Sequence, residues 1–205
     1  MDNRITMITS KKIRILSTLC LAATLLANQA FAAEALQFAP HPAISRAEFV
    51  RSMVDTFYTP EKIKECFAKL SPSRYTLLFT DVSIHEDYAG ELCVAMRAGI
   101  IAGYGDGSFR PNRPVNFAEA SKIITRSLHI VSTSNLPSGM PWFAQYVRSL
   151  EHRSAIPRTI TAFDHPMTLA DLDEILNRLH ENIADRPSVG YDELQRRTQQ
   201  KYRKA

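Results

Sequence analysis

Three pairs of side chains with the same spacing stand out as groups that could act chemically. Each pair is a hydroxyl or amide residue followed three positions later by a carboxylate: Ser45 and Glu48, Asn116 and Glu119, and Thr168 and Asp171. The polar residue can accept a hydrogen bond from a free N–H group in the first turn of a helix, and the acid can accept one from the N–H of the polar residue itself. The acid also lies at the positive end of the helix dipole. The spacing therefore predicts three capped helix starts, which accounts for the acids without a catalytic role.

The other reactive side chains match no known catalytic or metal-binding pattern. The six histidines are scattered along the chain, and neither Gly-x-Ser-x-Gly nor His-Glu-x-x-His occurs. Asp81 and Asp106 lack the regular oxygen spacing of a calcium loop, so we interpret them as turn and cap residues. We expect no catalytic residue, no metal site and no cofactor, and therefore a protein that is not an enzyme. A protease that uses a free cysteine thiol is the alternative.

Residues 1–32 have the pattern of a secretory signal peptide. Basic residues at Lys11, Lys12 and Arg14 introduce an apolar run that ends in Ala30-Phe31-Ala32, with small residues at the positions that signal peptidase reads. A membrane anchor is the alternative, but the run is short for a membrane span. We expect cleavage before Ala33 and no transmembrane segment in the mature chain.

Export changes how the cysteines are interpreted. The mature chain retains Cys66 and Cys93, and an oxidising compartment allows a disulfide between them to persist. With two cysteines, one intramolecular pairing exists. We therefore predict a Cys66–Cys93 disulfide, with two buried free thiols as the alternative.

The formal charge of +4 comes from the two ends of the chain. Residues 1–32 carry a surplus of three positive charges and residues 186–205 a surplus of four, whereas residues 33–185 hold 15 basic and 18 acidic side chains. Nucleic-acid binding needs basic residues clustered on the folded domain, so a nucleic-acid partner is not expected. We interpret residues 186–205 as a basic C-terminal tail, a frayed or disordered extension that is either solvated or in contact with an anionic polymer.

Amphipathic helices are predicted after each capping pair, within three similar segments near residues 44–58, 79–130 and 141–182. The second and third segments begin with an additional leading helix. In the second segment a glycine-rich loop, residues 103–111, follows that helix.

The first segment lacks a leading helix, because residues 33–43 are few and contain two prolines. An insert, residues 59–78, begins with a predicted short helix from Thr59 to Leu70, with Pro60 in its first turn. This helix, or a second chain, could fill the place of the missing leading helix.

These segments resemble the S-layer homology (SLH) family. The resemblance rests on Phe79-x-Asp81-Val82, on Ala98-Gly-Ile-Ile-x-Gly-Tyr-Gly-Asp-Gly-Ser-Phe-Arg-Pro111, and on Ser45-Arg-Ala-Glu48. It implies an all-α domain over residues 33–185, in which two and a half to three helix-loop-helix repeats pack as a pseudo-threefold bundle. It also implies an exported protein of the cell surface, cell wall or S-layer, attached non-covalently to a cell-wall polysaccharide that is often pyruvylated. The alternative is an envelope module for protein interaction or self-association.

The resemblance also implies which residues bind the polysaccharide. Arg46 matches the arginine with which the family contacts an acidic sugar, and the adjacent helix start likewise favours a carboxylate. A solvated surface arginine is the alternative. Aromatic rings can stack on sugar faces, although they also pack between helices. We assign polysaccharide binding to Arg46, Gly103, Tyr104 and Trp142.

The other two copies depart from the family pattern at the position of Arg46. Phe117 and Leu169 occupy it there. At most one groove therefore retains the expected anion donor.

Overall fold

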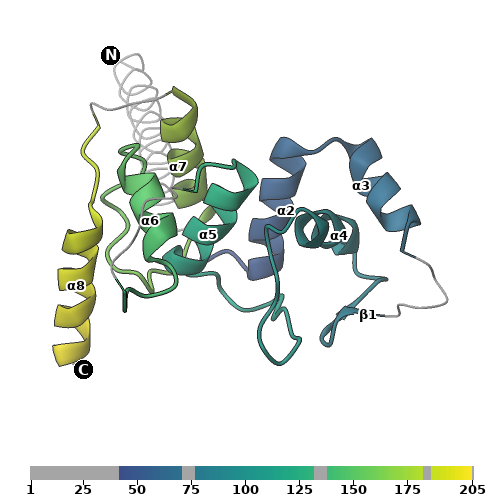
Figure 1. Ribbon diagram of the computed structural model, residues 1–205, viewed down its shortest axis with the longest axis horizontal. Coiled ribbons are helices and arrows are strands. Elements are labelled where there is room, and N and C mark those ends of the chain that lie inside the picture. Colours follow the sequence, from purple (N-terminus) through teal and green to yellow (C-terminus); the bar gives the residue numbers. More distant parts are fainter. Residues whose placement is uncertain (1–41, 71–76, 132–137, 182–185, 205) are drawn as a thin grey trace, which may run out of the picture. The chain divides into compact units, whose positions relative to one another are not determined.

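The computed structural model describes residues 42–70, 77–131, 138–181 and 186–204. The predicted signal peptide, residues 1–32, and the segment 33–41 lie outside the described residues. Most of the described chain is helical (Figure 1). The helices are α2 (Arg46–Phe57), α3 (Pro60–Ala68), α4 (Ala89–Arg97), α5 (Phe117–Ser127), α6 (Ala144–Glu151), α7 (Leu169–Glu181) and α8 (Tyr191–Lys204). No described helix is both long enough and apolar enough to span a membrane.

The three predicted capping pairs are confirmed. Ser45 and Glu48 form a reciprocal capping box at the start of α2, and Asn116 and Glu119 form one at the start of α5. At α7, the Thr168 N–H donates to the Asp171 carboxylate at 3.1 Å, and the Asp171 N–H donates to Thr168 Oγ1 at 3.1 Å. The spacing of polar and acidic residues thus located all three helix starts.

A closed cycle of backbone hydrogen bonds joins the residues that precede the three caps. The Ile44 N–H donates to the Met167 carbonyl at 2.8 Å, Met167 to Val115 at 2.9 Å, and Val115 to Ile44 at 3.2 Å. Ile44, Val115 and Met167 are all buried. The pseudo-threefold packing of the repeats stays a prediction, and this cycle is the observation that favours it.

The leading helices pack on the capped helix of the preceding copy. α4 packs against α2, and α6 packs against α5. The insert supplies α3, which starts at Pro60 with Thr59 as its N-cap and packs against α4. At Gly90 a Cβ atom would lie 2.7 Å from Ile63 Cγ2, so a glycine allows the two helices to approach closely.

The predicted disulfide joins α3 to α4. Cys66 and Cys93 are bonded, with their Cα atoms 6.2 Å apart. The alternative of two free thiols is therefore wrong, and these cysteines offer no thiolate nucleophile for a protease.

A two-stranded antiparallel sheet precedes α4 and was not anticipated. β1 (Leu77–Phe79) pairs with β2 (Val82–Ser83), with Phe79 opposite Val82. Both side chains contribute to the hydrophobic core. The Phe79-x-Asp81-Val82 motif spans the turn between the two strands, so this part of the chain is extended and departs from the all-α fold that was expected.

The C-terminal segment is a packed helix rather than a frayed tail. The Val189 N–H donates to the Ile156 carbonyl at 2.9 Å, and Tyr191 and Leu194 of α8 are buried. Thr198, one turn further along, accepts a hydrogen bond from the Phe163 N–H at 3.1 Å. Sequence reasoning missed this docking because three apolar or hydroxyl positions in a strongly polar helix make a weak periodic pattern.

Candidate ligand-binding site

All four predicted binding residues line one cavity of about 300 Å³. It lies where the start of α2, the loop after α4 and one face of α5 meet. Arg46 comes from α2, Gly103 and Tyr104 come from the loop, and Trp142 immediately precedes the turn into α6. The remaining lining residues are Ile100, Ile101, Ala102, Gly105, Glu119, Lys122 and Ile123.

Arg46 is held firmly by the loop that it faces. Its Nε donates to the Phe109 carbonyl at 3.0 Å, and its guanidinium carbon lies 4.9 Å from the Phe109 ring centre and 5.1 Å from that of Tyr104. The residue is only 7% exposed. The alternative of a solvated surface arginine is therefore wrong, because packing and a backbone hydrogen bond fix the direction of its charge.

Gly103 allows the loop to turn beside β1. Its φ of +69° lies in the left-handed region, and a Cβ atom there would lie 2.8 Å from the Phe79 ring and 2.9 Å from the Ser108 carbonyl oxygen. Tyr104 then closes the turn, because its N–H donates to that same carbonyl at 2.8 Å. A substitution at Gly103 would therefore displace the Tyr104 ring from the cavity wall.

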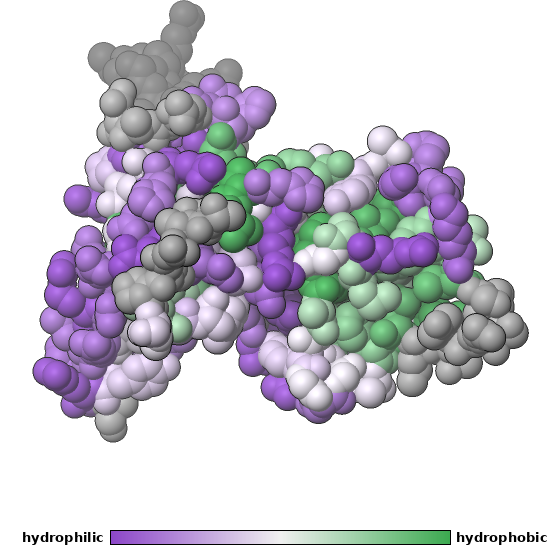
Figure 2. Space-filling model, in the orientation of Figure 1, coloured by the Kyte–Doolittle hydropathy of each residue, from purple (hydrophilic) through white to green (hydrophobic). Residues whose placement is uncertain are grey.

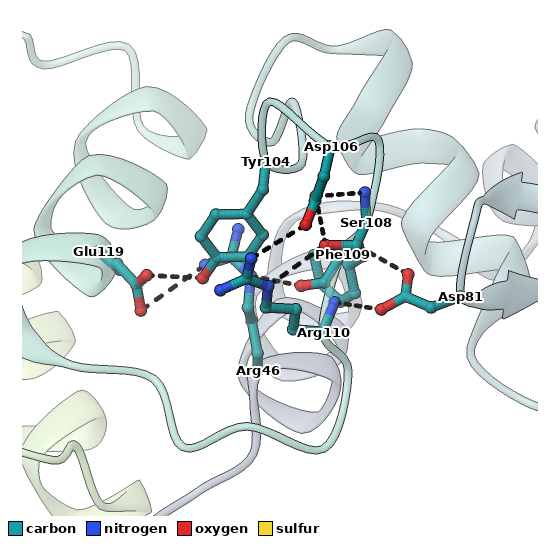
Figure 3. A network of polar contacts seen from close by, with 8 residues as sticks. All are labelled: Arg46, Asp81, Tyr104, Asp106, Ser108, Phe109, Arg110 and Glu119. Carbon is teal, nitrogen blue, oxygen red and sulfur yellow. Dashed lines mark hydrogen bonds and ion pairs between the residues drawn. The ribbon is translucent and has the colours of Figure 1, made fainter.

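Two aspartates hold the end of this loop, residues 108–110, in place, as Figure 3 shows. Asp81 accepts hydrogen bonds from the backbone N–H groups of Phe109 and Arg110, both at 2.7 Å. Asp106 accepts from the Ser108 N–H at 2.9 Å and pairs with Arg110 at 3.0 Å. Asp81 and Asp106 therefore act as turn residues. Across the described ranges, no three His, Cys, Asp or Glu side chains gather in a way that could hold a metal ion.

Glu119 caps α5 and also borders the cavity. Its carboxylate accepts a hydrogen bond from the Tyr104 hydroxyl at 2.7 Å and pairs with Arg113, while Arg46 Nη1 lies 3.9 Å away. Burial alone would raise the pKa of Glu119. The hydrogen bonds from Tyr104 and Arg113, together with the charge of Arg46, outweigh burial and lower that pKa below its ordinary value. Glu119 is therefore an ionised group with several positive and hydrogen-bonding partners.

Lys122 is a cavity residue that the sequence analysis missed. It lies one turn after Glu119 on α5, and its Nζ is 5.6 Å from the ring centre of Trp142. Burial lowers its pKa, and the neighbouring cations Arg126 and Arg46 act in the same direction. The i, i+3 spacing of Glu119 and Lys122 places both on one helix face, which is the signal that could have found it.

Trp142 presents its ring to solvent instead of filling a helix junction. It is 55% exposed, and its ring is nearly perpendicular to that of Phe143, with the ring centres 5.6 Å apart. Arg110 was also missed, and its guanidinium carbon lies 4.2 Å from the Tyr104 ring centre. The Tyr104 ring therefore lies among Arg46, Arg110 and Arg113, whereas the Trp142 ring has Lys122 nearby and is more than half exposed.

The corresponding places in the other copies differ from this cavity. Phe117 is fully buried, so it presents no group to a ligand, and Leu169 is 52% exposed but apolar. In the third copy, the backbone beside Ile156 is also covered, because the Val189 N–H and the Ser188 hydroxyl both bond to the Ile156 carbonyl. The C-terminal segment thus covers the backbone that follows α6 at Ile156.

Comparisons with known proteins point to the cell envelope. Residues 78–121 match the model of the S-layer homology domain. The chain is also similar to a protein of Brevibacillus brevis named middle cell wall protein, with 29% identity over 150 residues. That alignment covers 73% of this chain but only 13% of the relative, so the chain spans a small part of the relative's length.

Proposed function

Because this chain carries an S-layer homology domain at residues 78–121, as its motifs predict, we propose that it is a cell-envelope anchoring module that binds an acidic cell-wall saccharide. The observation that carries the proposal is the convergence of Arg46, Tyr104, Lys122 and Trp142 on one cavity. The similarity to a cell wall protein supports a location at the cell surface or in the wall. The proposed role is attachment without catalysis.

The cavity combines the two kinds of contact that an acidic sugar needs. Arg46 and Lys122 supply positive charge for a carboxylate, and charge-assisted hydrogen bonds to such a group are among the stronger polar contacts. The exposed ring of Trp142 supplies an apolar face for a sugar ring. Arg46 is preorganised by Phe109, so little side-chain entropy is lost when a ligand binds.

The test is co-sedimentation of the purified protein with cell-wall sacculi that retain or lack their polysaccharide. We expect binding to intact sacculi and loss of binding to stripped ones. Lys122→Ala should weaken binding by roughly tenfold, because it removes one charge-assisted contact. Lys62→Ala is the matched control, since it removes an exposed lysine from α3, which does not line the cavity.

Two outcomes would contradict the proposal. Equal retention by stripped sacculi would show that the polysaccharide is not the ligand and would favour a protein partner. Equal weakening by Lys122→Ala and Lys62→Ala would show that overall charge, rather than the cavity, drives retention.

A further inference from the structure

The C-terminal helix α8 concentrates positive charge on a surface that the cavity does not include. It carries two acids, Asp192 and Glu193, and five cations: Arg196, Arg197, Lys201, Arg203 and Lys204. The segment 33–185 has the opposite balance, with 18 acidic and 15 basic residues. The charge is therefore localised to one helix and is not a general property of the surface.

Docking of α8 fixes the direction in which these cations point. Tyr191, Leu194 and Thr198 recur at helical spacing and make up the inward face. Arg196 and Arg203, seven residues apart, lie on the opposite face, and both are exposed. A fixed array of charges binds a polymer better than a disordered tail does, because fewer side-chain and backbone states are lost.

Several cations of α8 have no acidic partner in the described part of the chain. Arg197 pairs with Glu193, and Lys201 pairs with Asp164. Within the described ranges, no ion pair involves the other three, Arg196, Arg203 and Lys204. These three guanidinium and ammonium groups retain their donors for an external anion.

A shallow cleft runs beside the cationic flank of the helix. It has a volume of about 440 Å³ and is lined by Thr161, Ala162, Arg197, Gln200, Lys201 and Lys204. Its three cations follow one another at i, i+4 and i+7, which spreads them over roughly 10 Å of helix axis. Figure 2 shows that the visible surface over α8 is hydrophilic.

We propose that α8 is a second envelope contact, which binds a linear polymer with regularly spaced anionic groups. Arg197, Lys201 and Lys204 beside the cleft, together with Arg196 and Arg203 on the neighbouring exposed face, offer repeated cations on an open surface. Such a surface fits a chain of phosphodiester or carboxylate groups, whereas a small metabolite needs an enclosing pocket. The interaction is electrostatic and falls steeply with ionic strength. It involves none of the residues that line the cavity, so it stands or falls independently of the proposed saccharide site.

The test measures binding of the purified protein to poly(glycerol phosphate), polygalacturonate and neutral dextran at low and physiological salt. The triple variant Arg196→Gln/Arg203→Gln/Lys204→Gln should weaken binding to the preferred anionic polymer by at least tenfold. It should also reduce the slope of the logarithm of the binding constant against the logarithm of the salt concentration by about two, by analogy with other polyelectrolytes. The polymer that binds more tightly identifies the anionic group. Dextran should not bind.

The matched control is Lys62→Gln/Lys64→Gln/Lys69→Gln on α3 and its C-cap, which makes the same change in net charge at exposed positions. We expect this control to change polymer binding by less than twofold. Equal weakening by the α3 control would overturn the proposal, as would a failure of both anionic polymers to bind. Thermal unfolding followed by circular dichroism checks that the triple variant and the control are both folded, as expected for substitutions at exposed positions.

Discussion

Asp171 shows how a single buried acid links the start of a helix to the surrounding loop. Its carboxylate accepts hydrogen bonds from the Thr159 hydroxyl at 2.8 Å and the Thr168 hydroxyl at 2.8 Å, and it lies 3.3 Å from His165 Nε2. Burial alone would raise its pKa, but the hydrogen bonds from His165, Thr159 and Thr168 lower it from 3.8 to about 2. The capping role was predictable from spacing, whereas the contacts from Thr159 and His165 depend on the fold of the preceding loop.

This pKa predicts an acid dependence of stability. The folded value of about 2 lies below the unperturbed 3.8, so ionised Asp171 stabilises the fold above about pH 5, and the contribution is lost as the pH falls towards 2. The unfolding free energy of the unmodified chain should be higher at pH 6 than at pH 2. We expect this difference to be about 2 kcal/mol smaller in Asp171→Asn, which has no carboxylate to titrate. Urea unfolding at several pH values measures it. Asp173→Asn, at an exposed position of the same helix, should leave the pH dependence close to that of the unmodified chain.

The candidate site divides into residues that sequence could and could not identify. Arg46, Gly103 and Tyr104 belong to motifs in which many neighbouring residues are fixed. The residue types and their order in those motifs identify the three as candidate site residues. Lys122 is a single lysine on an amphipathic helix, where a solvated side chain is the usual interpretation. Its spacing from Glu119 places it on the same face of α5, and the distance of 5.6 Å from its Nζ to the Trp142 ring centre shows that it reaches the cavity.

At the scale of secondary structure, the insert helix α3 depends on a covalent tie. Most side chains of α3 are exposed, and Cys66 is the only buried residue of this helix. The disulfide to Cys93 closes a separation of 27 residues. Without it, α3 would be attached to α4 mainly through partly buried side chains such as Ile63.

The double variant Cys66→Ser/Cys93→Ser should therefore lose about 3 kcal/mol of unfolding free energy, because the unfolded chain regains loop entropy. Urea unfolding with and without dithiothreitol measures this loss. The reductant should destabilise the unmodified protein by a similar amount and leave the double variant unchanged. An effect of dithiothreitol on the double variant would show that the loss has another source.

The docking of α8 makes a second prediction at this scale. Leu194 is fully buried, so Leu194→Ala should destabilise the protein by about 2–4 kcal/mol through lost burial and a residual cavity. Gln199→Ala, at an exposed position of the same helix, should change stability by less than 0.5 kcal/mol in either direction, as is typical of surface sites. Equal and small effects of both changes in thermal unfolding would mean that α8 does not contribute to the cooperative fold.

At the scale of the whole molecule, helix positions were more predictable than their partners. The capping residues and apolar spacing set the starts of α2, α5 and α7 from local chemistry alone. The β1–β2 pairing is local, but strands of three and two residues are too short to show an alternating pattern. The docking of residues 188–198 arises from contacts between distant segments, such as Val189 with Ile156. A single sequence contains no direct record of such contacts, so these features required the structure.

The cycle of hydrogen bonds through Ile44, Val115 and Met167 has a consequence for the order of folding. The first copy cannot complete its contacts until the chain has been made through Met167, because that residue accepts the Ile44 N–H. Contacts so distant in sequence slow folding and delay it until late in synthesis. A fragment of residues 42–131 should therefore fail to unfold cooperatively in urea, while residues 42–205 do so. If the predicted signal peptide directs export, late closure of this cycle would keep the chain unfolded, and so able to pass through a membrane channel, until Met167 has been made.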